Sequence, residues 1–153
     1  MPSILVIDDD HQICHLIRDA LEQAGDAVEE AHDGKEGMNR YRANRAAVVL
    51  MDLFMPNQDG LESIRILRHE FPASRVIAMT EDNNLVAVMK FLKIATVLGA
   101  CRTLVRLFEL TALLDAVAAE APCVADGHRA AARSRAPHRR SGRPQQIPSL
   151  LGC

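Results

Sequence analysis

The sequence predicts an α/β fold in which helices cover both faces of an open parallel sheet. The first observation is that residues 1–120 alternate five short apolar runs with five longer segments of helical periodicity. The second is that the run 47–51, AVVLM, is apolar throughout, as expected of a central parallel strand covered on both faces. With 153 residues and a mass of 16.8 kDa, the chain is long enough for one such domain and a tail.

The first half of this alternation begins with SILVI at residues 3–7, an apolar run that predicts a buried strand. Residues 11–24 form the first predicted helix, which ends at Gly25. The apolar residues of this helix recur at intervals of three and four: Ile13, Leu16, Ile17, Ala20 and Leu21. A weak strand is predicted over 27–31 and a polar helix over 34–44.

The second half continues after the strand AVVLM with the same alternation. Strands are predicted over 75–79 and 103–105, and helices over 60–70, 88–98 and 109–119. The inward faces of the first and last of these helices carry Leu61, Ile64, Ile66 and Leu67, and Leu110, Leu113, Leu114 and Val117.

The composition excludes several classes of protein. Aromatic residues make up 3% of the chain and Trp is absent, which disfavours the stacking platforms that bind single-stranded nucleic acid. The longest apolar stretch, 85–101, is interrupted by Lys90 and Lys93, so no membrane span is predicted. Acidic residues begin at Asp8, inside what would be the apolar part of a signal peptide, so the sequence disfavours a secreted protein. The four cysteines lack C-x-x-C spacing and are expected as free thiols, so we expect a cytoplasmic protein.

The charge of the chain changes sign near residue 121. Residues 1–120 carry a net charge of −7, whereas residues 121–153 carry +5 from six Arg and one Asp. The second segment has four Pro and few large aliphatic residues, so burial cannot offset its ordering entropy. We predict a domain over 1–120 and a disordered basic tail over 121–153. Binding of the tail to nucleic acid, to anionic lipid or to the acidic domain is an alternative to a plain solvated extension, which we favour.

Polar side chains stand at the ends of the predicted strands. Asp8 and Asp9 follow the first strand, Asp52 the third, Thr80 the fourth and Arg106 the fifth. In a parallel sheet these ends share one edge, where a site forms. Three carboxylates with open positions suit Mg²⁺, and a carboxylate beside Mg²⁺ can form an aspartyl phosphate. Alternatively, Asp10 or Asp9 caps the helix that begins near His11, and Asp52 is a turn residue.

Other motifs are weaker. His11, Cys14 and His15 have a spacing that could bind a soft metal, but we interpret the trio as incidental. Walker, G-x-G-x-x-G and G-x-S-x-G motifs are absent from the sequence, so nucleotide binding and serine hydrolysis lack support.

Over residues 3 to about 119 the chain resembles the receiver domain of two-component response regulators. The motifs that carry the resemblance are I-L-V-I-D-D at 4–9, D-L-F-M-P-N-Q-D-G at 52–60, V-I-A-M-T at 76–80 and L-G-A at 98–100. The second is the most specific, because it matches the family pattern D-x-x-M-P-x-x-D-G throughout. The resemblance implies a flavodoxin-like, doubly wound five-stranded parallel sheet with strand order 2-1-3-4-5.

The resemblance also implies roles for individual residues. Asp52 is the expected phosphoacceptor, and Asp8, Asp9, Asp52 and the backbone carbonyl of Phe54 are the expected Mg²⁺ ligands. Thr80 is the expected switch hydroxyl. Such a protein is not a turning-over enzyme; it accepts a phosphoryl group from a sensor histidine kinase or a histidine phosphotransfer protein.

The chain departs from the family at the fifth strand. Where the family has Lys-Pro, this chain has Arg106-Leu107, and a forked guanidinium does not replace an ammonium conservatively at a phosphate site. Leu107 also disfavours the cis peptide that the family's proline follows. Thr103 replaces the aromatic residue that accompanies the switch hydroxyl. We therefore expect phosphoacceptance to be retained, with altered switching in which Arg106 and Thr103 contact the phosphoryl group or its switch.

Expected partners follow from the absence of an output domain in this sequence. We expect signalling by contact with a downstream protein, and a homodimer through the fourth helix, fifth strand and fifth helix is a further possibility. The fourth helix has more apolar residues than one core face needs, which indicates a partner face or deeper burial: Val86, Met89, Leu92, Ile94, Val97 and Leu98. The alternatives are a degenerate receiver that binds partners without phosphate, and a nucleic-acid-binding regulator that uses the basic tail.

Overall fold

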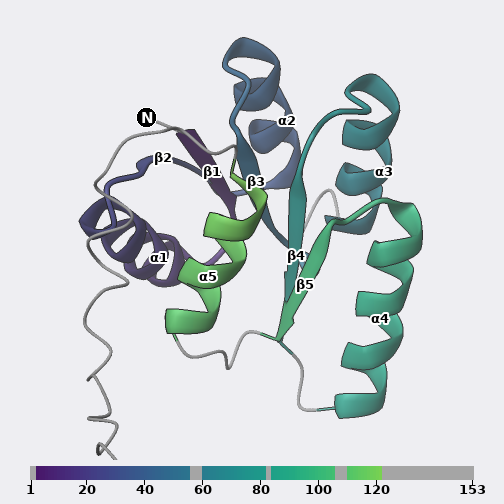
Figure 1. Ribbon diagram of the computed structural model, residues 1–153. Coiled ribbons are helices and arrows are strands. Elements are labelled where there is room, and N and C mark those ends of the chain that lie inside the picture. Colours follow the sequence, from purple (N-terminus) through teal and green to yellow (C-terminus); the bar gives the residue numbers. More distant parts are fainter. Residues whose placement is uncertain (1–2, 56–59, 82–83, 106–109, 122–153) are drawn as a thin grey trace, which may run out of the picture.

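A computed structural model of the chain describes residues 3–55, 60–81, 84–105 and 110–121. Within these residues, strands and helices alternate along the chain (Figure 1). The strands are β1 (Ser3–Ile7), β2 (Ala27–Ala31), β3 (Val48–Asp52), β4 (Val76–Thr80) and β5 (Arg102–Val105). The helices are α1 (His11–Gln23), α2 (Gly34–Ala43), α3 (Gly60–Glu70), α4 (Leu85–Leu98) and α5 (Leu110–Glu120).

All pairings in the sheet are parallel, in the order β2-β1-β3-β4-β5. The predicted α/β fold class and strand order are therefore confirmed. Helices α1 and α5 contact each other on one face of the sheet, while α2, α3 and α4 lie side by side on the other (Figure 1).

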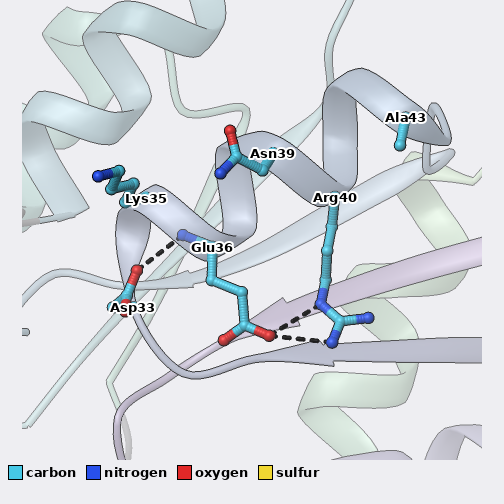
Figure 2. A pocket seen from close by; sticks show the side chains of 6 residues that line it. All are labelled: Asp33, Lys35, Glu36, Asn39, Arg40 and Ala43. Carbon is cyan, nitrogen blue, oxygen red and sulfur yellow. Dashed lines mark hydrogen bonds and ion pairs between the residues drawn. The ribbon is translucent and has the colours of Figure 1, made fainter.

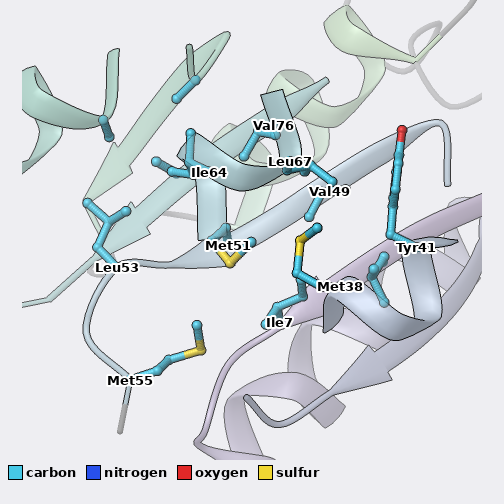
Figure 3. Close-up of a cluster of buried hydrophobic side chains, with 14 of the residues drawn as sticks. Ile7, Met38, Tyr41, Val49, Met51, Leu53, Met55, Ile64, Leu67 and Val76 are labelled. Carbon is cyan, nitrogen blue, oxygen red and sulfur yellow. The ribbon is translucent and has the colours of Figure 1, made fainter. Parts of the chain in front are cut away.

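Two apolar cores lie on the two faces of the sheet, because successive side chains of a strand point to opposite faces. On β3, Val49 and Met51 belong to the core beneath α2, α3 and α4, which Figure 3 shows from close by. Val48 and Leu50 of the same strand belong to the core beneath α1 and α5. All five β3 residues are buried, so the interpretation of this run as a strand covered on both faces is correct for residues 48–51, while Ala47 precedes the strand.

The ends of several elements differ from the sequence-based expectation. Helix α4 starts at Leu85 rather than at residue 88, because the side chain of Asn84 accepts hydrogen bonds from the N–H groups of Val86 and Ala87 at 3.1 and 3.3 Å. Strands β3 and β4 each extend one residue further than predicted, so Asp52 and Thr80 are the last strand residues rather than loop residues.

Most of the surplus apolar residues on α4 are not buried. Val86 and Val97 are about four-fifths exposed, at 79% and 82%, whereas Leu92 is 8% exposed. The expectation of deeper burial is therefore wrong for the first two residues and right for Leu92.

Helices that could cross a lipid bilayer do not occur within the described ranges. Arg106, Leu107 and the predicted basic tail from residue 122 onward lie outside those ranges.

Leu67 and Leu16 provide a matched test of the core. Leu67 is 1% exposed on the buried face of α3, whereas Leu16 is 59% exposed on α1. We expect Leu67→Ala to lower the free energy of unfolding by about 2–5 kcal/mol, because it leaves a cavity. Leu16→Ala should lower it by less than about 0.5 kcal/mol. Urea unfolding followed by circular dichroism measures both, and equal losses would contradict this assignment of the core.

Candidate functional site

Three carboxylates meet at the carboxyl edge of the sheet. Asp8 and Asp9 follow β1, and Asp52 ends β3, the strand paired with β1. One carboxylate oxygen from each of the three lies within 4.8 Å of the others. Asp8 is 0% and Asp52 is 2% exposed, whereas Asp9 is open to solvent. The sheet register therefore brings Asp52 together with two acids that lie 44 and 43 positions earlier in the chain.

Backbone N–H groups orient two of these carboxylates. The N–H of Asp10 donates to Asp8 Oδ1 at 2.9 Å, and the N–H of Phe54 lies 3.4 Å from Asp52 Oδ1. Asp10, not Asp9, caps α1, and it accepts from the N–H groups of Gln12 and Ile13 at 3.0 and 3.3 Å. The capping explanation for the acids after β1 thus applies to Asp10 alone.

The donor set fits a hard divalent cation. Neighbouring carboxylates repel one another, and burial of two of them strengthens the repulsion because the local dielectric is low. A cation bound by all three oxygens would relieve this repulsion, and oxygen ligands with open positions are the preference of Mg²⁺.

Thr80 contributes a buried hydroxyl beside this cluster. It ends β4 one residue past Met79, which pairs in register with Asp52. Thr80 is 0% exposed, and its Oγ1 has no hydrogen-bond partner among the described residues. An unpaired buried hydroxyl costs about 1–3 kcal/mol, so its position favours a ligand oxygen as partner.

Gly60 lies against the backbone of Asp52. A Cβ at this position would overlap the carbonyl oxygen of Asp52 and would lie 2.7 Å from Leu53 Cα. The N–H of Gly60 donates to the carbonyl of Leu53 at 3.1 Å, which closes the loop between β3 and α3. Glycine is needed here for this close approach and not for a left-handed backbone conformation, because its φ is not positive.

The comparisons with known proteins agree with this geometry. The sequence profile described as "Response regulator receiver domain" matches residues 4–118. The chain belongs to the response regulator receiver family.

Curated relatives and solved receiver structures support the assignment. Over 84 residues the chain is 39% identical to the CAI-1 autoinducer sensor kinase/phosphatase CqsS of Vibrio cholerae, covering 53% of this chain and 12% of that protein. Over 65 residues it is 42% identical to response regulator MprA of Mycobacterium avium, covering 42% of this chain and 28% of that regulator. The chain thus spans less than a third of either relative.

Two solved structures are similar over most of their length. The Francisella response regulator 1452 receiver domain has a TM-score of 0.70 and 27% identity, covering 78% of this chain and 96% of that chain. The chemotaxis protein CheY4 of Vibrio cholerae has a TM-score of 0.70 and 25% identity, covering 78% and 98%.

Thr103, a further residue expected at the receiver's site, lies away from the three aspartates. Thr103 on β5 pairs in register with Ala78, two residues before Thr80, and lines a groove with Met89, Lys93 and other α4 residues. Arg106 lies outside the described residues, so its expected contact with the phosphoryl group stays a prediction.

The thiol of Cys14 in this receiver lies in the core beneath α1 and α5 and contacts the backbone of Asp8. Its Sγ donates to the backbone carbonyl of Asp8 at 3.3 Å, and the residue is fully buried. Burial, together with the nearby charges of Asp8 and Glu30, raises the pKa of Cys14 to about 12. A thiol that stays protonated is a poor soft-metal ligand, and His15 instead pairs with Glu30 at 3.0 Å. The burial of Cys14 and the pairing of His15 support the interpretation that the spacing of His11, Cys14 and His15 is incidental.

A separate hollow of about 540 Å³ lies over α2 of the receiver (Figure 2). Glu36, one of its lining residues, pairs with Arg40 at 2.9 Å. The N–H of His32 also donates to Glu36 at 2.9 Å, and this contact is the main reason that the pKa of Glu36 is lowered. These polar groups satisfy one another, and none of the three clustered aspartates lines the hollow.

Gly60→Ala tests the close approach to Asp52. We expect it to lower the free energy of unfolding by about 1–3 kcal/mol and to weaken Mg²⁺ binding, because backbone must move. Gly37→Ala is the comparison variant, since its Cβ would meet side-chain atoms of Ile7 rather than backbone. Urea unfolding and Mg²⁺ titration by NMR measure both effects. Unchanged Mg²⁺ affinity in Gly60→Ala would count against the proposed packing.

Cys14 should give the receiver a pH-dependent stability. Because the pKa is raised from 9.0 to about 12, the contribution of Cys14 is fully present below pH 9.0 and is lost as the pH rises through about 12. We expect the free energy of unfolding to fall more steeply between about pH 8 and about pH 10 in the wild type than in Cys14→Ala. The exposed-thiol variant Cys101→Ala should behave as the wild type. Parallel slopes in all three proteins would refute the assignment.

Proposed function

We propose that this receiver accepts a phosphoryl group on Asp52 from a phosphohistidine of a sensor histidine kinase or a histidine phosphotransfer protein. The observation that carries the proposal is the cluster of Asp8, Asp9 and Asp52 with the unpaired hydroxyl of Thr80 beside it. Such a site suits phosphoryl transfer. A metal ion bound by the three carboxylates would neutralise charge on the phosphoryl oxygens, and the hydroxyl would donate a hydrogen bond to one of them.

We further propose Mg²⁺ as the cofactor, held by the three aspartates and the backbone carbonyl of Phe54. When bound, Mg²⁺ would neutralise negative charge on the carboxylates and on the incoming phosphoryl oxygens. Asp8 and Asp9 act as its ligands, and the N–H of Phe54 helps to orient the carboxylate of Asp52.

In the transfer step, a carboxylate oxygen of Asp52 forms a bond to phosphorus while the bond between phosphorus and the donor imidazole nitrogen breaks. The electron pair of that bond returns to the imidazole nitrogen. The hydroxyl of Thr80 then donates to a phosphoryl oxygen, which supplies the partner that this buried group lacks among the described residues. Arg106 is proposed to add a positive charge near the same oxygens.

The receiver is thus proposed as a substrate of phosphotransfer and not as a turning-over enzyme. Phosphorylation adds about −1.5 to −2 charge at pH 7 and would bias the loops around the site. The position of Thr103 beside α4 supports altered switching. The signal is proposed to pass to a downstream protein, or to a second copy through α4, β5 and α5. We propose the cytoplasm as its compartment, since Cys14 and Cys101 are free thiols.

Intact mass after incubation with Mg²⁺ and acetyl phosphate tests the proposal. We expect one phosphoryl adduct on the wild type, none on Asp52→Asn, and none when the metal is chelated. Asp19→Asn is the control, because Asp19 is exposed on α1 and should leave the adduct unchanged. An adduct that persists in Asp52→Asn would place the phosphoacceptor elsewhere. Absence of both the adduct and Mg²⁺ binding in the wild type would favour a phosphate-independent receiver.

A further inference from the structure

Phe54 is an outward-facing aromatic residue in the loop that follows the phosphoacceptor candidate. Its neighbours Leu53 and Met55 are buried in the core beneath α2, α3 and α4, whereas Phe54 itself is 39% exposed. Its N–H faces Asp52 Oδ1, and its carbonyl is the proposed fourth metal ligand. The conformation of this one residue therefore affects both the phosphoacceptor and the proposed metal site.

Phe91 of α4 contacts the ring of Phe54. The two ring centroids lie 4.7 Å apart with an interplanar angle of 77°, an edge-to-face arrangement. Phe91 is partly buried and packs against the core that includes Val88 and Leu92, its neighbours on α4. It is thus held by a packed helix, whereas Phe54 lies in a loop.

We infer that Phe91 is a positioning residue for the loop that orients Asp52 and carries the proposed metal-ligating carbonyl of Phe54. The inference deepens the proposed function and rests on it for the metal. Without the ring of Phe91, the ring of Phe54 loses its described aromatic partner and the loop samples more conformations. Because the two rings are in contact, a change in the loop on metal binding would also change the contacts of α4. The same helix carries the exposed residues Met89 and Val86.

The chain offers a matched control for this contact. Tyr41 on α2 and Phe71 form a second aromatic pair, with centroids 5.2 Å apart and an interplanar angle of 55°. Phe71 is also partly buried against the same core. It follows the last residue of α3, whereas Gly60 is the first residue of that helix. Phe71→Ala therefore removes a comparable ring without touching the loop at Phe54.

The experiment compares wild type, Phe91→Ala and Phe71→Ala by backbone NMR, first without metal and then in a Mg²⁺ titration. Without metal, we expect the Gly60 amide, which is bonded to the Leu53 carbonyl, to exchange about two- to tenfold faster in Phe91→Ala only. In the titration, we expect the Kd for Mg²⁺ to rise about two- to tenfold in Phe91→Ala and to stay within about twofold in Phe71→Ala.

Two conservative variants guard against misfolding. Phe91→Tyr keeps the ring and should restore the wild-type affinity, whereas Phe91→Leu keeps apolar bulk without the ring and should shift both readouts in the direction of Phe91→Ala. Equal effects of Phe91→Ala and Phe71→Ala, or no effect of Phe91→Leu on either readout, would overturn the inference. If the wild type formed no phosphoryl adduct while Gly60 exchange and Mg²⁺ affinity changed as expected, the proposed function would fail and the role of Phe91 would stand.

Discussion

The parallel hydrogen bonding of β1, β3 and β4 is the constraint on which the rest of the structure depends. Parallel pairing makes neighbouring strands end at the same edge, so the residue that follows β1 and the last residues of β3 and β4 meet there. Asp8, Asp52 and Thr80 are distant in sequence and become neighbours for this reason. The four crossover connections also place helices on the faces of the sheet, which is why the three central strands are buried on both sides.

The same sheet edge works against the stability of the fold. A core of aliphatic residues ends there in two buried carboxylates and a buried hydroxyl that has no partner among the described residues. Carboxylates are rarely buried unless a partner or a metal compensates for their lost hydration. Local departure from good core composition, within a chain that is otherwise consistent with its fold, is expected at functional sites.

The two faces of helix α4 lie in different surroundings, one in the core and one in solvent. Its buried face, with Val88, Leu92 and Ala95, anchors it to the sheet. Its outer face leaves Leu85, Val86 and other large apolar side chains in solvent. Between the two faces, Phe91 reaches the loop that carries Phe54. A helix that contacts both a reactive loop and a potential partner can couple the two, because a packed element moves as a unit.

Much of the fold and of the candidate site could be predicted from local patterns. Apolar runs and three-to-four spacing placed each strand and helix within a few residues, since these patterns depend on neighbours along the chain. The ends of the predicted strands and the family motifs pointed to the three aspartates and Thr80 as one group, and the structure brings these four to one edge. The order of the strands came from the family resemblance, because periodicity does not specify which strands pair.

Other features depended on contacts between distant residues, which no local pattern encodes. The sequence alone could not show that Asp10 caps α1 while Asp9 joins the cluster, or that Gly60 is needed for its approach to the Asp52 carbonyl. The pairing of Phe54 with Phe91 had no sequence signal, because 37 positions separate the two rings. The sequence by itself determined the elements and the chemistry available at their ends. Tertiary packing decided which of those groups meet, since distance in space is set by the sheet and not by the chain.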